Sequence, residues 1–259
     1  MPDASLPQPE KTEARAGPLF RTVLRFDAVD STNEVAKLLL GQGADEGTVV
    51  VAKRQATGKG RYGRAWASPL GGLYVSLVLR PEPRQVPVLG LLAGIPVAKA
   101  LRHYGVFAAL KWPNDVVFMG KKIAGILSEG VYRGDAFYAV IGIGVNTTVD
   151  LDRLPEDVRP RATTLKKEVA EYVDNDDFME YMLRHFEDIV SRYRTGTGDR
   201  LIKDYRGLCT MIGKEVVVGT PQGRLAGRAY DITAQGALVV MDKAGKKTEV
   251  LDGTVEDVA

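Results

Sequence analysis

A cationic, glycine-rich segment separates two strongly apolar segments in the first third of the chain. Residues 53–66 (KRQATGKGRYGRAW) carry five cationic side chains, three glycines and no carboxylate. The flanking segments, 48–52 and 73–79, are rich in apolar and β-branched residues over strand-like lengths, so each predicts a buried strand. Glycines let backbone N–H groups converge on a ligand, and arginine side chains suit phosphate oxygens. The pattern predicts a phosphate-binding loop, although a solvated basic loop has a similar composition.

Two better-known glycine loops do not fit the surroundings of this one. Residues 58–63 match the dinucleotide-binding pattern G-x-G-x-x-G, but that motif opens a helix, whereas the next regular segment here is a predicted strand. The glycine loop of protein kinases does join two strands. However, neither His103 nor His185 is followed by Arg-Asp, and the chain contains no Asp-Phe-Gly. Both alternatives are therefore excluded.

The overall composition is that of an ordinary globular protein. The chain has 259 residues, 45% of them hydrophobic, and its net charge of +2 is too small to predict bulk binding of nucleic acid. Two histidines and one cysteine do not supply a zinc site. The single cysteine, Cys209, excludes an intramolecular disulfide and predicts a structural thiol in a reducing compartment, the cytoplasm. No apolar run approaches the length that crosses a bilayer, so we expect no membrane partner.

Composition divides the chain into three parts. Residues 1–18 contain three prolines before Gly17-Pro18 and no hydrophobic segment, which predicts a disordered N-terminal tail whose deletion leaves activity unchanged. Residues 19–210 contain the predicted loop and most of the apolar segments. In residues 211–259, glycines separate four or five short segments, which predicts a small β-barrel.

Three segments have the pattern of a helix. Ser31 followed by Glu34 is a capping box, which predicts a helix start at this point. The apolar stretch 86–105 predicts a buried helix with a kink at Pro96. Residues 174–193 begin with acidic residues and then place apolar residues at intervals of three and four, which predicts an amphipathic helix.

Short strands separated by turns dominate the middle of the chain. A weakly alternating segment, 20–27, predicts the first strand, and further strand patterns fall at 106–110, 116–119, 123–129 and 136–145. Hairpins of this kind outnumber strand–helix–strand crossovers. We therefore predict an α+β fold: a mixed, mostly antiparallel sheet with helices on one side.

Five motif segments, taken in order, resemble those of biotin–protein ligases. They are Ser31-Thr32-Asn33, Gln55 with the loop through Trp66, Lys111-Trp112-Pro113-Asn114-Asp115, Lys122-Ile123-Ala124-Gly125-Ile126-Leu127, and Gly142-Ile143-Gly144-Val145-Asn146. The match runs from about residue 26 to 148. The resemblance implies the catalytic fold of that family, which is like that of class II aminoacyl-tRNA synthetases, with residues 211–259 as its small SH3-like β-barrel.

The resemblance also implies two overlapping sites. The biotin site would contain Ser31, Thr32, Asn33, Gln55, Gly58, Lys59, Gly60, Arg61, Lys122, Gly125 and Gly142. The ATP and adenylate site would contain Lys59, Arg61, Arg64, Trp66, Lys111, Asn114, Asp115 and Asn146. In these sets Ser31, Thr32 and Gln55 would bond the ureido ring, and Arg61 and Lys122 would act in catalysis. Lys59 stands where the family often has arginine, which keeps the charge but loses the forked donor.

The activity implied is ligation in two steps. Biotin and ATP would give biotinyl-5′-AMP and pyrophosphate, and a lysine of a biotin carboxyl carrier protein or domain would then take the biotinyl group. Mg²⁺ would accompany the nucleotide, with Asp115 as a candidate ligand.

Two other functions belong to related proteins. A lipoate- or octanoate-transferring enzyme of related fold would need an apolar channel instead of polar contacts from Ser31, Thr32 and Gln55. A biotin-responsive repressor would need a helix-turn-helix module of roughly 60 residues, more than precedes the first predicted strand here. We therefore expect no DNA partner. Whether the chain forms a homodimer stays open.

Overall fold

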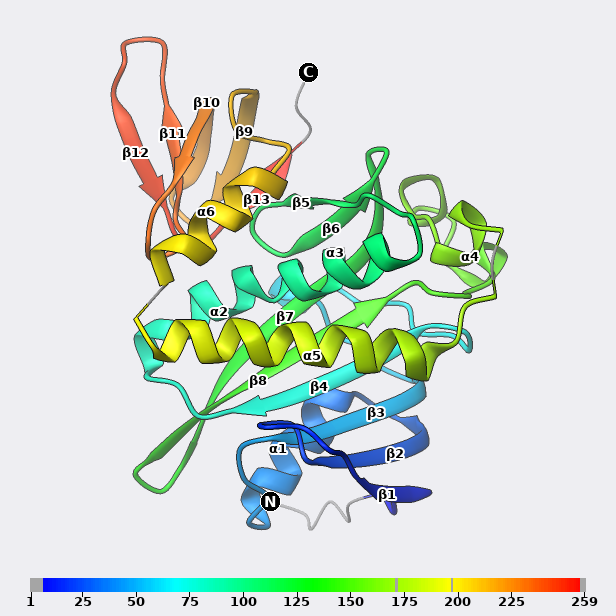
Figure 1. Ribbon diagram of the computed structural model, residues 1–259. Helices are drawn as coiled ribbons and strands as arrows, with labels where there is room; N and C mark the ends of the chain where they lie inside the picture. Colours follow the sequence, from blue (N-terminus) through cyan, green and yellow to red (C-terminus); the bar gives the residue numbers. More distant parts are fainter. Residues whose placement is uncertain (1–6, 171, 197, 257–259) are drawn as a thin grey trace.

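The computed structural model describes residues 7–170, 172–196 and 198–256, which form a large α+β unit and a smaller C-terminal sheet (Figure 1). The large sheet has eight strands in the order β1-β2-β3-β4-β8-β7-β6-β5. Their bounds are β1 (Lys11–Ala14), β2 (Thr22–Val29), β3 (Thr48–Gln55), β4 (Leu73–Leu79), β5 (Ala109–Lys111), β6 (Asp115–Phe118), β7 (Lys121–Arg133) and β8 (Ala136–Val145). Only the β2–β3 pair is parallel. The predicted mixed, mostly antiparallel sheet is confirmed.

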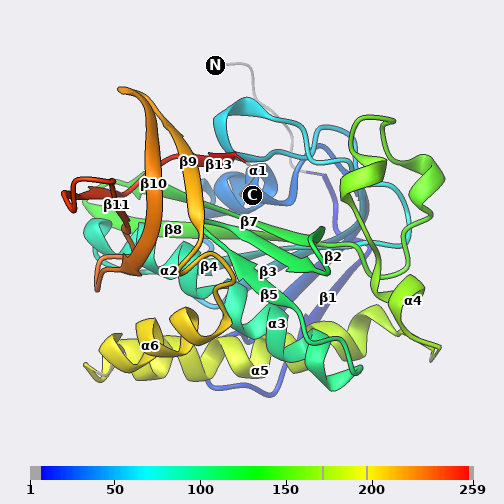
Figure 2. The same cartoon turned by 90° about the horizontal axis from the view of Figure 1, so that it is seen from above.

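Helices cover both faces of this sheet rather than one. The helices are α1 (Thr32–Gly41), α2 (Val86–Leu92), α3 (Gly94–His103), α4 (Leu165–Glu168), α5 (Asn175–Arg194) and α6 (Gly198–Leu208). Helices α2, α3, α5 and α6 pack on one face, as expected, whereas α1 packs on the other (Figure 2). Along β3, Val49 and Val51 pack into the core beneath α2, α3, α5 and α6, whereas Val50 and Ala52 pack into the core beneath α1. An unbroken apolar strand is buried on both faces, so it requires cover on each.

The long apolar stretch forms two helices with a break at Ala93. Pro96 has no N–H to donate to the carbonyl of Leu92, where α2 ends, and its ring crowds that carbonyl, so the predicted kink is confirmed one turn upstream. Residues 83–103 do reach the length and mean hydropathy, 1.2, of a spanning helix, so the expectation that no run approaches this length is wrong. However, 72% of that window is buried inside the protein, as in a core helix.

The N-terminal segment is ordered from residue 7, which corrects the prediction of a disordered tail over 1–18. Strand β1 pairs antiparallel with β2. Beyond it, Arg15 forms ion pairs with Glu180 at 2.6 Å and Glu187 at 2.7 Å on α5. Residues 1–6 lie outside the described residues. Composition failed here because it shows neither the pairing with β2 nor the ion-pair partners of Arg15, which lie more than 160 residues away.

The C-terminal strands form a five-stranded antiparallel sheet in the order β12-β11-β10-β9-β13. They are β9 (Glu215–Thr220), β10 (Gly223–Ile232), β11 (Leu238–Met241), β12 (Lys247–Val250) and β13 (Thr254–Glu256). The indole N–H of Trp112 donates to the carbonyl of Gly236 at 2.9 Å, which ties this sheet to the large one. Cys209, just before the sheet, is buried, and burial raises the pKa of its thiol, in keeping with a structural role.

Candidate active site

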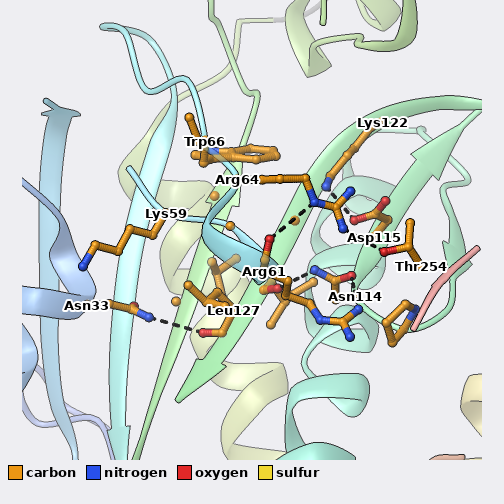
Figure 3. Close-up of a pocket in the computed structure, with 18 of the residues that line it drawn as sticks. Asn33, Lys59, Arg61, Arg64, Trp66, Asn114, Asp115, Lys122, Leu127 and Thr254 are labelled. Atoms are coloured by element: carbon orange, nitrogen blue, oxygen red, sulfur yellow. Dashed lines mark hydrogen bonds and ion pairs between the residues drawn. The ribbon is translucent and has the colours of Figure 1, made fainter. Parts of the chain in front are cut away.

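One pocket collects most of the predicted site residues on the α1 face of the large sheet (Figure 3). It lies between the first turn of α1, the loop after β3, strands β7 and β8, and the turn before β13, and its volume is about 170 Å³. The predicted residues that line it are Ser31, Thr32, Asn33, Gln55, Lys59, Gly60, Arg61, Arg64, Trp66, Lys111, Asn114, Asp115, Lys122, Gly125 and Gly142. Gly58 and Asn146 do not line it.

Neutral hydrogen-bonding groups form one end of the pocket. Gln55 Oε1 accepts from the backbone N–H of Thr32 at 2.8 Å and lies 3.1 Å from its hydroxyl. Gln55 Nε2 donates to Ser68 Oγ at 2.8 Å, so the amide is held at both ends. Ser31 is the N-cap residue of α1, so the helix starts where predicted, but its side chain makes no capping bond and the predicted capping box is wrong. Its partner Glu34 is engaged instead by Lys59 at 2.7 Å and Lys37 at 3.0 Å.

A β-bulge directs Lys122 into the other end of the pocket. Opposite β6, Val116 pairs with Ala124 and Val117 pairs with Lys122, so one residue of β7 is extra. Consequently Ile123 and Ala124 both pack into the core on the face covered by α2 and α3. Lys122 lies on the opposite face, where it lines the pocket together with Gly125. Simple alternation would have placed Lys122 on the opposite face. Lys122 is therefore positioned by a local irregularity and is not a surface turn residue.

Two contacts hold the Lys122 ammonium group. Its Nζ lies 2.6 Å from Asp115 Oδ1 and 5.1 Å from the centre of the Trp66 ring. Trp66 rests on Gly125 and Gly144, where a Cβ atom would lie 3.1 Å and 2.3 Å from the indole. The indole nitrogen is buried and has no hydrogen-bond partner among the described residues. The Trp66 indole thus holds an unused N–H donor that faces Gly144.

The two loop arginines reach the C-terminal sheet. Arg61 pairs with Asp252 and donates to the carbonyl of Gly253 at 3.1 Å. Arg64 donates to Thr254 Oγ1 at 2.9 Å (Figure 3). Arg61 also lies 3.3 Å from Asn114 Oδ1. The C-terminal residues of the pocket, 253–255, were not predicted, because nothing in their sequence pattern marks them. Their role could be found only from the fold.

Gly58 and Asn146 shape the site rather than line it. Gly58 donates no side chain, but a Cβ there would lie 2.4 Å from the Trp66 carbonyl oxygen. Asn146 is buried, and its Nδ2 donates to the carbonyl of Thr163 at 3.2 Å. Gly144, which belongs to the fifth motif but to neither predicted site, does line the pocket and leaves the space that Trp66 fills. Its signal was visible as the second glycine of the strand 136–145.

The acidic residues of the described chain offer no ready-made metal cage. Within residues 7–170, 172–196 and 198–256, no group of three or more His, Cys, Asp or Glu side chains could hold a metal ion. Mg²⁺, however, is usually bound by one or two carboxylates together with substrate phosphates. Asp115, at the cationic end, fits the role of a single carboxylate ligand that acts with a nucleotide.

Comparisons with known proteins identify the family of this chain. The Biotin/lipoate A/B protein ligase family matches residues 25–146, and the Biotin protein ligase C terminal domain matches residues 211–256. A biotin–[acetyl-CoA-carboxylase] ligase of Mycobacterium tuberculosis is 34% identical over 87% of this chain and 85% of the relative. The bifunctional ligase/repressor BirA of Bacillus subtilis is 34% identical over 87% of this chain and 71% of the relative.

A solved structure shares the fold as well. The biotin protein ligase of Aquifex aeolicus, in complex with biotin and ATP, superposes with a TM-score of 0.78 at 29% identity. The match covers 90% of this chain and 97% of the Aquifex chain. With both family models matched in order and relatives aligned over most of their length, the chain belongs to the biotin/lipoate A/B protein ligase family.

Proposed function

We propose that this chain is an ATP-dependent biotin–protein ligase. It would activate biotin as biotinyl-5′-AMP and transfer the biotinyl group to a lysine of a biotin carboxyl carrier domain. The observation that carries the proposal is the polarity of one pocket, which has neutral hydrogen-bonding groups at Thr32 and Gln55 and cations at Arg61 and Lys122. Biotin has the matching ends, a ureido ring and a carboxylate.

In the first step, a carboxylate oxygen of biotin attacks the α-phosphorus of ATP. The bond to the bridging oxygen breaks, and pyrophosphate leaves with the electron pair. Both reactants are anions, so bringing them together requires positive charge at the point of contact. Lys122, held by Asp115 at 2.6 Å, and Arg61 supply that charge. Mg²⁺, held by Asp115 together with the phosphates, would neutralise charge on the departing pyrophosphate.

In the second step, the neutral amine of the acceptor lysine attacks the carbonyl carbon of the mixed anhydride. The carbon–oxygen bond to phosphate breaks, AMP leaves, and the amine proton passes to solvent. We infer that the acceptor is the carrier domain of a biotin-dependent carboxylase in the cytoplasm. The names of relatives that act on acetyl-CoA carboxylase support this inference.

We propose a division of labour between residues 19–210 and residues 211–259. The first would form the catalytic domain, and the second, an SH3-like barrel, would close the nucleotide end of the pocket. Support comes from Gly253, Thr254 and Val255, which line the pocket, and from the contacts that Arg61 makes with this region.

Transfer of labelled biotin to a purified carrier domain tests the proposal. We expect label on the acceptor lysine only when ATP is present, together with release of pyrophosphate and AMP. Lipoate and octanoate run in parallel should not be transferred, because Thr32 and Gln55 offer polar contacts and not an apolar channel. Transfer of lipoate and not of biotin would overturn the assignment in favour of the related acyl ligases.

A further inference from the structure

A chain of hydrogen bonds connects Glu129 through Asn33 and Ser76 to Thr32, at the neutral end of the pocket. Ser76, on β4, is completely buried, and its Oγ lies 2.6 Å from Asn33 Oδ1 and 2.8 Å from Thr32 Oγ1. Asn33 Nδ2 in turn donates to Glu129 Oε2 at 2.6 Å. Neither Ser76 nor Glu129 lines the pocket.

The charge of Glu129 fixes the direction of this chain. Lys37 Nζ lies 2.6 Å from Glu129 Oε1, so the carboxylate is paired and acts only as an acceptor. The Asn33 amide must therefore turn its NH₂ group toward Glu129 and its oxygen toward Ser76. Gly142 makes this possible, since a Cβ at that position would lie 2.3 Å from Asn33 Oδ1.

The positions of the Ser76 and Thr32 hydroxyl hydrogens determine whether Thr32 donates a hydrogen bond to a ligand or accepts one from it. Asn33 Oδ1 cannot donate, so the single hydroxyl hydrogen of Ser76 is used on Asn33. The Thr32 hydroxyl has two neighbours, Ser76 Oγ and Gln55 Oε1, and both are left as acceptors. Its hydrogen is therefore directed into the protein. Toward the pocket, Thr32 presents lone pairs and accepts hydrogen bonds.

We propose that Glu129, Asn33 and Ser76 form a relay that sets Thr32 as an acceptor for a ureido N–H of biotin. Glu129 and Ser76 are positioning residues: they act through Thr32 and touch no substrate. The inference rests on the proposed function and adds the residues that select the ring. A ligand that places a carbonyl or ether oxygen against Thr32 is disfavoured, because two acceptors then face each other.

The test measures KM for biotin and kcat in the adenylation step, by pyrophosphate exchange, for Ser76→Ala and Glu129→Gln. We expect KM to rise about tenfold in each, the value of one net hydrogen bond, with kcat within about twofold of wild type. Ser128→Ala is the matched control, since Ser128 lies next to Glu129 on β7 but faces Gly90 of α2 on the opposite side of the sheet. Its KM should not change. Thermal unfolding of each variant confirms that it is folded.

A double-mutant cycle distinguishes the relay from a merely structural role. In a Thr32→Val background, Ser76→Ala and Glu129→Gln should have no further effect on KM, because the group through which they act is gone. Desthiobiotin, which keeps the ureido ring without the sulfur ring, should show the same KM changes as biotin. Additive effects in the cycle, or effects confined to biotin, would overturn the relay. Absence of adenylation by wild type would instead refute the proposed function.

Discussion

Arg15 and Glu187 form a buried ion pair across 172 positions of sequence, with 8% and 7% of their side chains exposed. Glu187 also accepts from the backbone N–H groups of Leu19 and Phe20 at 3.2 Å and 3.1 Å. These contacts of Glu187 link helix α5 to the segment that leads into β2.

Removing the Arg15–Glu187 ion pair should destabilise the protein. We expect Arg15→Ala to lower the free energy of unfolding by about 3 kcal/mol, since it leaves a buried carboxylate without its cation. Deletion of residues 1–18 should have at least the same effect, contrary to the expectation from composition. Urea unfolding measures both. Arg21→Ala, which removes only an exposed bond to Gly17, is the control and should change little. Equal stability of the Arg15 variant and wild type would contradict this account.

The same cluster makes stability depend on acid. Partial burial opposes the change, but hydrogen bonds from Arg15 and Arg184 lower the pKa of Glu180 below its ordinary value of 4.5. A lowered native pKa gives stability that is complete above the unfolded pKa and is lost as the pH falls through the native one. Glu180→Gln should therefore be less stable than wild type at pH 7, by roughly 1 kcal/mol, and the difference should shrink below pH 4.5. A difference independent of pH would argue against the pair.

Loss of Lys122 should affect chemistry and not folding. We expect Lys122→Ala to slow adenylate formation by at least ~100-fold, about 2.7 kcal/mol, the scale of one lost electrostatic donor. Single-turnover release of pyrophosphate measures the step. Lys121→Ala is the control, because Lys121 is the exposed neighbour that precedes the bulge. A rate within threefold of wild type would remove Lys122 from the chemical step.

Contacts of the loop with the C-terminal sheet should break easily. Asp252 is 57% exposed, and exposed ion pairs contribute roughly 0–1 kcal/mol, so ligand phosphates can replace it at Arg61. We expect amide exchange across residues 54–66 to slow markedly with biotin and ATP, and Asp252→Asn to speed it only in the empty protein. Glu249→Gln, an exposed neutralisation in the same sheet, is the control. Identical protection with and without ligands would mean that the loop is preformed.

The sequence predicted what depends on local pattern and missed what depends on distant contacts. The loop of 53–66 and its flanking strands follow from charge, glycine and apolar runs over a few residues. The unbroken apolar run 48–52 also indicated cover on both faces, a signal not used when helices were placed on one side. By contrast, the direction of Lys122 depends on one extra residue in β7, which no alternation rule reveals.

Other parts of the site could not be predicted from the sequence, because they depend on contacts between segments that are distant along the chain. In the sequence, nothing distinguishes Ser76 from other serines in apolar strands. Its role depends on the fold, which places Thr32 and Asn33 within hydrogen-bonding distance of its hydroxyl. Gly253 joins a pocket whose loop lies nearly 200 residues earlier. Both depend on which segments pack together.

Strand β7 carries Glu129 near one end of the pocket and Lys122 near the other, seven residues apart on one hydrogen-bonded strand. At about 3.3 Å per residue, this span is on the order of 20 Å and cannot stretch. We therefore expect the strand to keep the distance between Lys122 and the ring-binding end of the pocket constant. Biotin analogues with a side chain one methylene shorter or longer should still bind but be adenylated at least ~10-fold more slowly, since small displacements from the reactive geometry carry large losses of rate. Equal rates for all three acids would show that the loop, and not the strand, sets that distance.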